Sequence, residues 1–321
     1  MKCDIICVIK IGLGAGLCCS GRVMLDLVKD LNGLTAAIAV VVGRAYRLTP
    51  LQVKCTYPVF RGEADGAEPV FVKVGTKEEW TRTRDLLQAI GDSGFFSRLV
   101  TEKPIDYGGH AVFVMEWKAS RTVFPEDMNP QQIESFVSGC VKLGKELRRV
   151  AQGTAHPTAG TPEELYDDIV RYASRHPVAG NLLKQLVKIP EAERTYGKRP
   201  LAICHGDFHA KNFGFVGDEL VAVYDFDKLT EGLACGDLVN ALIERFSCFH
   251  LSRAARMRLK DVTRRIVAAV PWSREELVIA ANVIRLQFAA RRIRKHPNSA
   301  WVAVDVWRRD RALREFLTEI W

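Results

Sequence analysis

A stretch in the second half of the chain, residues 201–227 with the sequence LAICHGDFHAKNFGFVGDELVAVYDFD, constrains the fold more than any other. Four apolar residues at its start indicate a short buried strand, and a His-Gly-Asp triplet follows that strand directly. Asn212 lies five residues after Asp207, and Asp225 lies thirteen residues after Asn212. Two apolar arms around a Gly-Asp pair occupy the interval from Asn212 to Asp225, which predicts a β-hairpin.

The expected register of this hairpin brings polar side chains together. With a two-residue loop at the Gly-Asp pair, Asn212 faces Val223, and the side chains of opposed residues share one face of a sheet. Asn212 and Asp225 are then expected on the same side of the hairpin, with Asp207 entering just before them. Two carboxylates and an amide oxygen repel one another unless a cation lies among them, and Mg²⁺ prefers such ligands.

The same spacing is typical of phosphoryl transfer in kinases, where an Asp, an Asn five residues later and a second Asp serve the reaction. The segments HGDFHAKN and VYDFD resemble the aminoglycoside phosphotransferase and choline kinase-like family, which is related to the protein kinases. The resemblance implies that Asp207 is the catalytic base and that Asn212 and Asp225 bind Mg²⁺. It also implies that His205 is a structural residue of the catalytic loop and that a buried Asp237 supports this loop.

The resemblance implies an α+β, protein-kinase-like fold with two lobes. Residues 46–117 are expected to form a small nucleotide-binding lobe, mainly an antiparallel sheet with one helix. Residues 118–321 are expected to form a larger, mainly helical lobe for catalysis and substrate binding, with the nucleotide between the lobes. Residues 1–45 are interpreted as an N-terminal extension without an assigned role, because their apolar run is too short to span a bilayer.

One Lys in an apolar strand of the expected small lobe is the candidate phosphate ligand. A buried Lys73 needs a partner, and the resemblance implies that it neutralises nucleotide phosphates and pairs with a Glu of the next helix. Glu79 is the predicted partner, although it also matches a capping box with Thr76; Glu78 and Asp85 are alternatives. An outward-facing Lys on an edge strand is the structural alternative for Lys73.

The strand predicted over residues 111–117 ends the small lobe and leads into a hinge. The resemblance implies that backbone groups near Met115 and Trp117 contact the adenine of ATP, with GTP as the alternative nucleotide. Beyond this hinge, helical periodicity of apolar residues is the main signal. It predicts helices over residues 131–150, 162–173, 238–249, 252–270, 273–293 and 308–320.

Charge and cysteine content limit the partners and the compartment. The net charge is +8 and the pI is near 9.0, so anionic partners such as a nucleotide and an acidic or phosphorylated acceptor are favoured; solvated helix faces explain the excess equally well. No motif predicts specific binding of nucleic acid. Nine Cys without CxxC pairs indicate buried thiols in a reducing compartment, so we expect a cytoplasmic protein without a membrane span.

The predicted reaction moves the γ-phosphoryl group of ATP to a hydroxyl of a small molecule. A sugar, a saccharide, an amino alcohol or an aminoglycoside would serve as acceptor, and the basic excess favours a neutral or anionic one over polycationic aminoglycosides. Alternatives are a pseudokinase or scaffold, a protein kinase, and a zinc hydrolase using His205, Asp207 and His209. A protein kinase is disfavoured because HGD replaces His-Arg-Asp. The oligomeric state is left open.

Overall fold

The computed structural model describes residues 30–51, 58–91, 94–151, 162–186, 202–226, 229–248, 250–299 and 301–320. Contacts divide the chain into two compact units. Unit 1 comprises residues 1–80 and 99–117, and unit 2 comprises residues 81–98 and 118–321. Most of the predicted N-terminal extension lies outside the described residues, and so does most of the segment at residues 53–60, whose sequence is typical of a strand.

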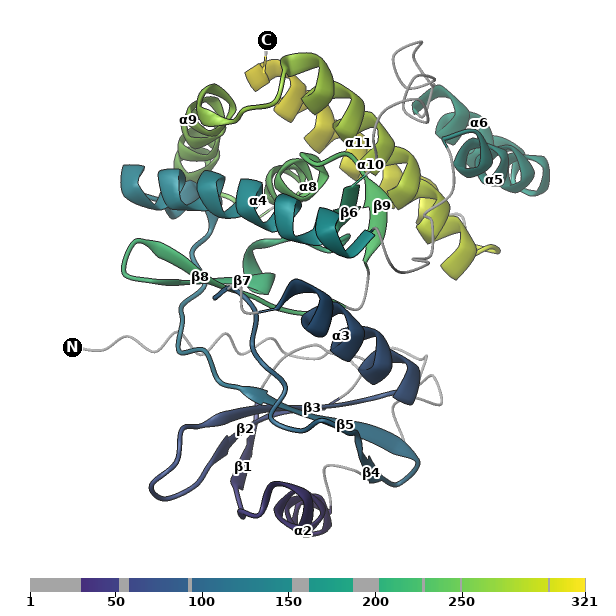
Figure 1. Cartoon of the computed structure of the whole chain (residues 1–321). Coiled ribbons are helices and arrows are strands. Elements are labelled where there is room, and N and C mark those ends of the chain that lie inside the picture. The colour runs from purple at the N-terminus through teal and green to yellow at the C-terminus, as the bar shows by residue number, and fades with distance from the viewer. Residues whose placement is uncertain are drawn as a thin grey trace. The chain divides into compact units, whose positions relative to one another are not determined.

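Unit 1 is built on a five-stranded antiparallel sheet with the order β1-β2-β3-β5-β4 (Figure 1). Its elements are α2 (Leu31–Val42), β1 (Arg47–Pro50), β2 (Val59–Glu63), β3 (Val70–Gly75), β4 (Ile105–Tyr107) and β5 (His110–Glu116). Alternate residues of β3 are buried, namely Val70, Val72 and Val74. They pack with Leu34 and Ile38 of α2, so the period-two pattern of the strand gives the sheet its apolar face.

The apolar run at residues 36–42, which fits either a strand or a helix in the sequence, is the second half of α2. The helix begins at the Asp30 cap, whose side chain accepts a hydrogen bond from the backbone N–H of Gly33 at 3.0 Å. It ends at Gly43, which has the left-handed φ of 72° that favours glycine. Capping at both ends therefore decides between the two alternatives.

Unit 2 is mainly helical, and helix α8 lies among α4, α9, α10 and α11 (Figure 1). Helix α3 (Lys77–Ile90) begins in unit 1 and continues in unit 2. The other α-helices in the described part of the chain are α4 (Pro130–Ala151), α5 (Pro162–Arg175), α6 (Pro177–Leu186), α8 (Gly236–Phe246), α9 (Arg253–Ala269), α10 (Arg274–Lys295) and α11 (Trp301–Ile320). None of the described helices is long and apolar enough to cross a membrane.

Two small antiparallel pairs and two short 3₁₀ turns are the other elements among the described residues of unit 2. Strand β6 pairs with β9, and β7 pairs with β8 as the predicted hairpin. Their bounds are η1 (Pro125–Asp127), β6 (Ala202–Cys204), η3 (Ala210–Asn212), β7 (Phe213–Val216), β8 (Glu219–Val223) and β9 (Thr230–Gly232). Phe136 of α4 stacks near Phe208 and Phe213, with ring centroids 6.1 and 5.1 Å away, so aromatic packing supports the segment between β6 and β7.

The sequence places the helices of unit 2 well, with two exceptions. Ser273 and Glu276, whose spacing in the sequence is typical of a capping box, form a reciprocal capping box at the start of α10. Helix α6 has no counterpart in the prediction. Helix α11 contains the predicted residues 308–320 and begins earlier, at Trp301; Val302 and Val306 of its first turns are buried in a cluster with α5 and α10 that the sequence does not reveal.

Candidate active site

A buried carboxylate holds the loop that follows β6. Asp237, in the first turn of α8, accepts hydrogen bonds from the backbone N–H groups of His205 at 2.7 Å and Gly206 at 3.1 Å. Burial raises the pKa of the Asp237 carboxyl, and the N–H bonds from His205 and Gly206 oppose that increase. Gly206 has a φ of 76°, which glycine adopts without strain. The backbone just before Asp207 is therefore held by hydrogen bonds to the Asp237 side chain of α8.

The His205 imidazole joins the same loop to the end of the hairpin. Its Nδ1 accepts from the backbone N–H of Asp207 at 3.4 Å, so Nε2 carries the proton and donates to the carbonyl oxygen of Tyr224 at 2.6 Å. The ring is fully buried and lies beside the rings of Phe208 and Phe226, at centroid distances of 5.7 and 4.8 Å. His205 thus connects the segment that contains Asp207 to the residue that precedes Asp225.

Asn212 closes the turn on its other side. Its side-chain Nδ2 donates to the backbone carbonyl oxygen of Asp207 at 3.0 Å. The backbone carbonyl oxygen of Asn212 accepts from the backbone N–H of Tyr224 at 2.8 Å. The side chain is buried. Because Nδ2 is bonded to the loop, the amide oxygen is the remaining acceptor of this side chain. The segment from Asp207 to Asn212 is therefore a local turn that the Asn212 side chain closes with a hydrogen bond.

The hairpin has the predicted loop but not the predicted register at its open end. Val216 pairs with Glu219 as expected, whereas an irregularity in the middle of the hairpin shifts the remaining pairs by one residue. Phe213, not Asn212, pairs with Val223. The prediction that Asn212 faces Val223 is wrong, because simple alternation from the turn cannot account for a bulge.

Asp225, at the end of the hairpin, has an unusual backbone conformation. It has a φ of 63°, and it is the one non-glycine residue with a positive φ among those that the structure describes. Asp is one of the few side chains that tolerate this region, where backbone strain is often found at functional sites. The strand β8 ends at Val223, before Asp225. The direction of the Asp225 side chain is therefore set by this backbone conformation and not by the alternation of the hairpin.

A cavity of about 150 Å³ lies next to Asp207 within unit 2. The β6–β7 segment contributes Asp207 and His209, and α8 contributes Asn240 and Glu244. Helices α10 and α11 contribute Gln287, Phe288, Arg291 and Arg309, and β9 and the residue after it also line the cavity. Asn240 Nδ2 also donates to the carbonyl oxygen of Phe208 at 3.0 Å, so the cavity wall is bonded to the loop that contains Asp207.

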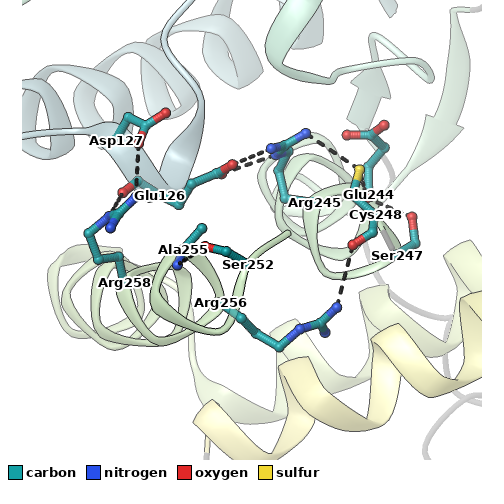
Figure 2. A network of polar contacts seen from close by, with 10 residues as sticks. All are labelled: Glu126, Asp127, Glu244, Arg245, Ser247, Cys248, Ser252, Ala255, Arg256 and Arg258. Atoms are coloured by element: carbon teal, nitrogen blue, oxygen red, sulfur yellow. Dashed lines mark hydrogen bonds and ion pairs between the residues drawn. The ribbon is translucent and has the colours of Figure 1, made fainter. Parts of the chain in front are cut away.

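A buried ion pair anchors helix α8, which contributes both Asp237 and part of the cavity wall. Figure 2 shows the Arg245 guanidinium directed at the carboxylate of Glu126 in η1, with an Nε–Oε2 distance of 3.0 Å. The guanidinium also lies over the Phe124 ring, 4.2 Å from its centroid. Glu244 enters this network through its backbone carbonyl, which accepts from Ser247. Its carboxylate lines the cavity instead.

The predicted nucleotide residues of unit 1 lie on β3, at the start of α3 and on β5. Lys73 is half-buried on β3, a central strand, so the edge-strand alternative is wrong. Its Nζ is 5.8 Å from the centroid of the Phe113 ring. Glu79 forms the predicted capping box: its Oε2 accepts from Thr76 N–H at 2.8 Å and its N–H donates to Thr76 Oγ1 at 3.1 Å. Asp85 accepts hydrogen bonds from Arg84.

Met115 and Trp117 are both half-buried at the end of β5. Met115 pairs with Phe71 on one side and forms a bridge with Leu99 on the other, so its backbone belongs to the sheet. The N–H of Trp117 donates to the carbonyl of Pro69 at 3.3 Å, and Arg61 lies 5.2 Å from the centroid of its ring.

The zinc alternative does not agree with the structure. Both ring nitrogens of His205 are bonded to backbone groups, as described above. His209 Nε2 lies 3.9 Å from Asp207 Oδ2, while its Nδ1 accepts from the Lys211 N–H. Over the described ranges, no group of three or more His, Cys, Asp or Glu side chains is placed to hold a metal ion.

Residues of α8, α10 and α11 complete the candidate site, and no local motif indicates them. The sequence patterns indicate none of Asn240, Glu244, Arg291 and Arg309 as site residues. Most of the other basic residues of α9 and α10 form ion pairs, such as Arg292 with Asp305. Helical spacing shows which residues share a face, but it does not show which face meets a cavity formed by three separate helices.

Comparison with known proteins identifies the family. Residues 59–267 match the model of the phosphotransferase enzyme family known as APH. The chain belongs to this family. It is therefore a small-molecule phosphotransferase, and the unit composition fits the predicted α+β, protein-kinase-like fold. A search of curated proteins finds no match.

Several solved structures of similar fold are described as phosphotransferases of antibiotics. Aminoglycoside phosphotransferase APH(4)-Ia, solved in a ternary complex with ADP and hygromycin B, has a TM-score of 0.59 and 11% identity, covering 88% of this chain and 98% of its own. Macrolide 2′-phosphotransferase MphH from Brachybacterium faecium has a TM-score of 0.57 and 11% identity, with coverages of 87% and 96%. Spectinomycin phosphotransferase APH(9)-Ia has a TM-score of 0.56 and 10% identity, with coverages of 90% and 98%.

Proposed function

We propose that this phosphotransferase moves the γ-phosphoryl group of ATP to a hydroxyl of a small molecule bound in the cavity beside Asp207. The observation that supports this most directly is the loop of Asp207, which is bonded to α8 through Asp237 and to the hairpin through His205 and Asn212. ATP is chosen over GTP because similar structures are described in complexes with ADP or AMP-PNP. Such a rigid loop suits a reaction that depends on positioning.

In the proposed reaction, the acceptor oxygen attacks the γ-phosphorus while the bond from that phosphorus to the β–γ bridging oxygen breaks. The hydroxyl proton moves to the Asp207 carboxylate, and ADP leaves. Asp207 lines the cavity, so a bound hydroxyl can approach it directly. His205 and Asp237 would act as positioning residues, because their hydrogen bonds hold the backbone around Asp207.

The donor set at the end of the hairpin fits Mg²⁺. Asn212 keeps its amide oxygen as an acceptor, and Asp225 provides a carboxylate directly after the residue that bonds to Asn212. When bound, Mg²⁺ would offset negative charge on the phosphates. Lys73 would neutralise the remaining phosphate charge, with Glu79, Met115 and Trp117 as the other proposed nucleotide residues.

The test is a nucleotide-consumption assay against a library of sugars, amino alcohols, hydroxy acids and aminoglycosides, with and without Mg²⁺. Asp207→Asn should retain ATP binding and lose at least about a hundredfold in kcat, since general base catalysis typically contributes that much. Asp218→Asn, in the exposed turn of the same hairpin, is the matched control and should keep normal turnover. Near-normal acceptor phosphorylation by Asp207→Asn would reject Asp207 as the base.

A further inference from the structure

The two arginines on the wall of the Asp207 cavity differ from the other arginines on the same helices. Ion pairs with carboxylates engage most of the α10 and α11 arginines, namely Arg285, Arg292, Arg294, Arg308, Arg311 and Arg314. Among the described residues, neither Arg291 nor Arg309 has a carboxylate within ion-pair distance. The cationic side chains without an ion pair therefore include both arginines that line the cavity.

Arg309 is held in place without neutralisation of its charge. One Nη2 bond goes to the neutral amide oxygen of Asn240 at 2.7 Å, and the guanidinium lies over the Phe288 ring at 5.2 Å from its centroid. Its Nε is buried and has no hydrogen-bond partner among the described residues. Burial, together with the charge of Arg291, lowers the pKa of Arg309 to about 10, while Glu244 opposes this change. The site therefore carries an oriented guanidinium that makes no direct ion pair with a carboxylate of the described residues.

The two guanidinium groups of the cavity wall both come from α10 and α11, namely Arg291 and Arg309. The wall also carries the carboxylates of Asp207, Asp237 and Glu244, so the case for an anion rests on the arginine side of the cavity and not on the total charge. Asp237 is engaged by backbone N–H groups, and Asp207 is the proposed base. Guanidinium groups bind carboxylate and phosphate oxygens through paired hydrogen bonds. An ammonium-rich ligand would instead meet two guanidinium groups.

The size of the cavity favours a small acceptor. Its volume of about 150 Å³ is smaller than the roughly 300–1,000 Å³ typical of sites for drug-sized ligands. We propose that the acceptor is a small anionic alcohol, such as a hydroxy acid or a sugar phosphate, whose anionic group binds Arg291 and Arg309 while its hydroxyl faces Asp207. This inference rests on the proposed function and specifies the acceptor class for the same cavity.

The first experiment compares acceptors that differ in one charged group. Glucose and glucose 6-phosphate form one pair, glycerol and glycerate form another, and hygromycin B and spectinomycin represent cationic acceptors. The anionic member of at least one pair should give a kcat/KM at least about tenfold higher than its neutral counterpart, because charge-assisted hydrogen bonds are the strong ones. A preference for the neutral or cationic acceptors would overturn the inference and leave the proposed function intact.

Matched arginine variants assign the effect to the cavity. Arg291→Gln removes an exposed side chain and should fold normally, and it should raise the KM for the anionic acceptor about tenfold with little change in kcat. Arg294→Gln is the control on the same helix, because Arg294 pairs with Asp168 and does not line the cavity. Arg309→Lys retains the charge but loses the planar fork, so it should raise the same KM. Equal KM values for Arg291→Gln and Arg294→Gln would contradict the inference.

A binding measurement tests the anion site without turnover. If no acceptor is phosphorylated, that result counts against the proposed function alone, and binding still shows whether Arg291 and Arg309 hold an anion. Calorimetric titration of the full chain with inorganic phosphate and with glycerate should show about tenfold weaker binding for Arg291→Gln than for Arg294→Gln. Binding that is equal in the two variants, or absent in the unmodified protein, would show that these arginines do not form an anion site.

Discussion

Replacing Asp237 tests how the loop of Asp207 is stabilised. In Asp237→Asn the amide oxygen can accept only one of the two N–H bonds now made by His205 and Gly206, and the amide nitrogen faces the other donor. A buried donor left without its acceptor costs about 1–3 kcal/mol of unfolding free energy. The neutral amide avoids the desolvation that raises the Asp237 pKa, so the lower half of that range is expected. Asp237→Ala loses both bonds and should cost roughly 2–6 kcal/mol.

The assay is urea unfolding followed by circular dichroism, together with turnover of any acceptor found in the library. Asp261→Asn is the control, because Asp261 is exposed and forms only an i,i+4 pair with Arg265, worth about 0.5 kcal/mol. Both Asp237 variants should also lose kcat more than they raise the KM for ATP, since they disturb the backbone next to Asp207. The reasoning would be refuted if Asp237→Asn and Asp237→Ala unfolded at the same urea concentration as the control.

Three further outcomes follow from local contacts. Asn212→Ala should raise the Mg²⁺ concentration that gives half-maximal activity about tenfold, as measured in a metal titration; an unchanged titration curve would exclude Asn212 as a ligand. Glu126→Ala should destabilise the chain by about 3–5 kcal/mol in chemical denaturation, because it leaves the partly buried charge of Arg245 unpaired; a loss below about 1 kcal/mol would contradict this. The Cys204 thiol, whose pKa is raised well above normal by burial, should resist a thiol reagent in the native state, while the partly buried Cys248, whose pKa burial also raises, should react slowly, as seen by mass spectrometry.

Much of the fold follows from patterns that are local in the chain. Alternate apolar residues identify β3, the Thr76–Glu79 capping box identifies the start of α3, and the equivalent box identifies the start of α10. The His-Gly-Asp triplet and the spacing to Asn212 also describe a local turn, because the Asn212 side chain bonds to the carbonyl of Asp207. Short-range hydrogen bonds and side-chain periodicity are properties of neighbouring residues, so the sequence can reveal them.

Other features depend on segments that are distant in the chain. The hairpin register shifts at a bulge, and Asp225 adopts a positive φ, neither of which alternation of residues can predict. Arg291 and Arg309 meet at one cavity because α10 and α11 pack beside α8, although their periodicity resembles that of the ion-paired arginines on the same helices.

The sequence alone therefore determined the family, the reaction class and the residues of the loop, since each depends on a short motif. Only the tertiary structure decided which arginines face the cavity and remain without carboxylate partners. The physical reason is that ion pairing and burial depend on which helices are neighbours, and packing of the whole chain sets those neighbours.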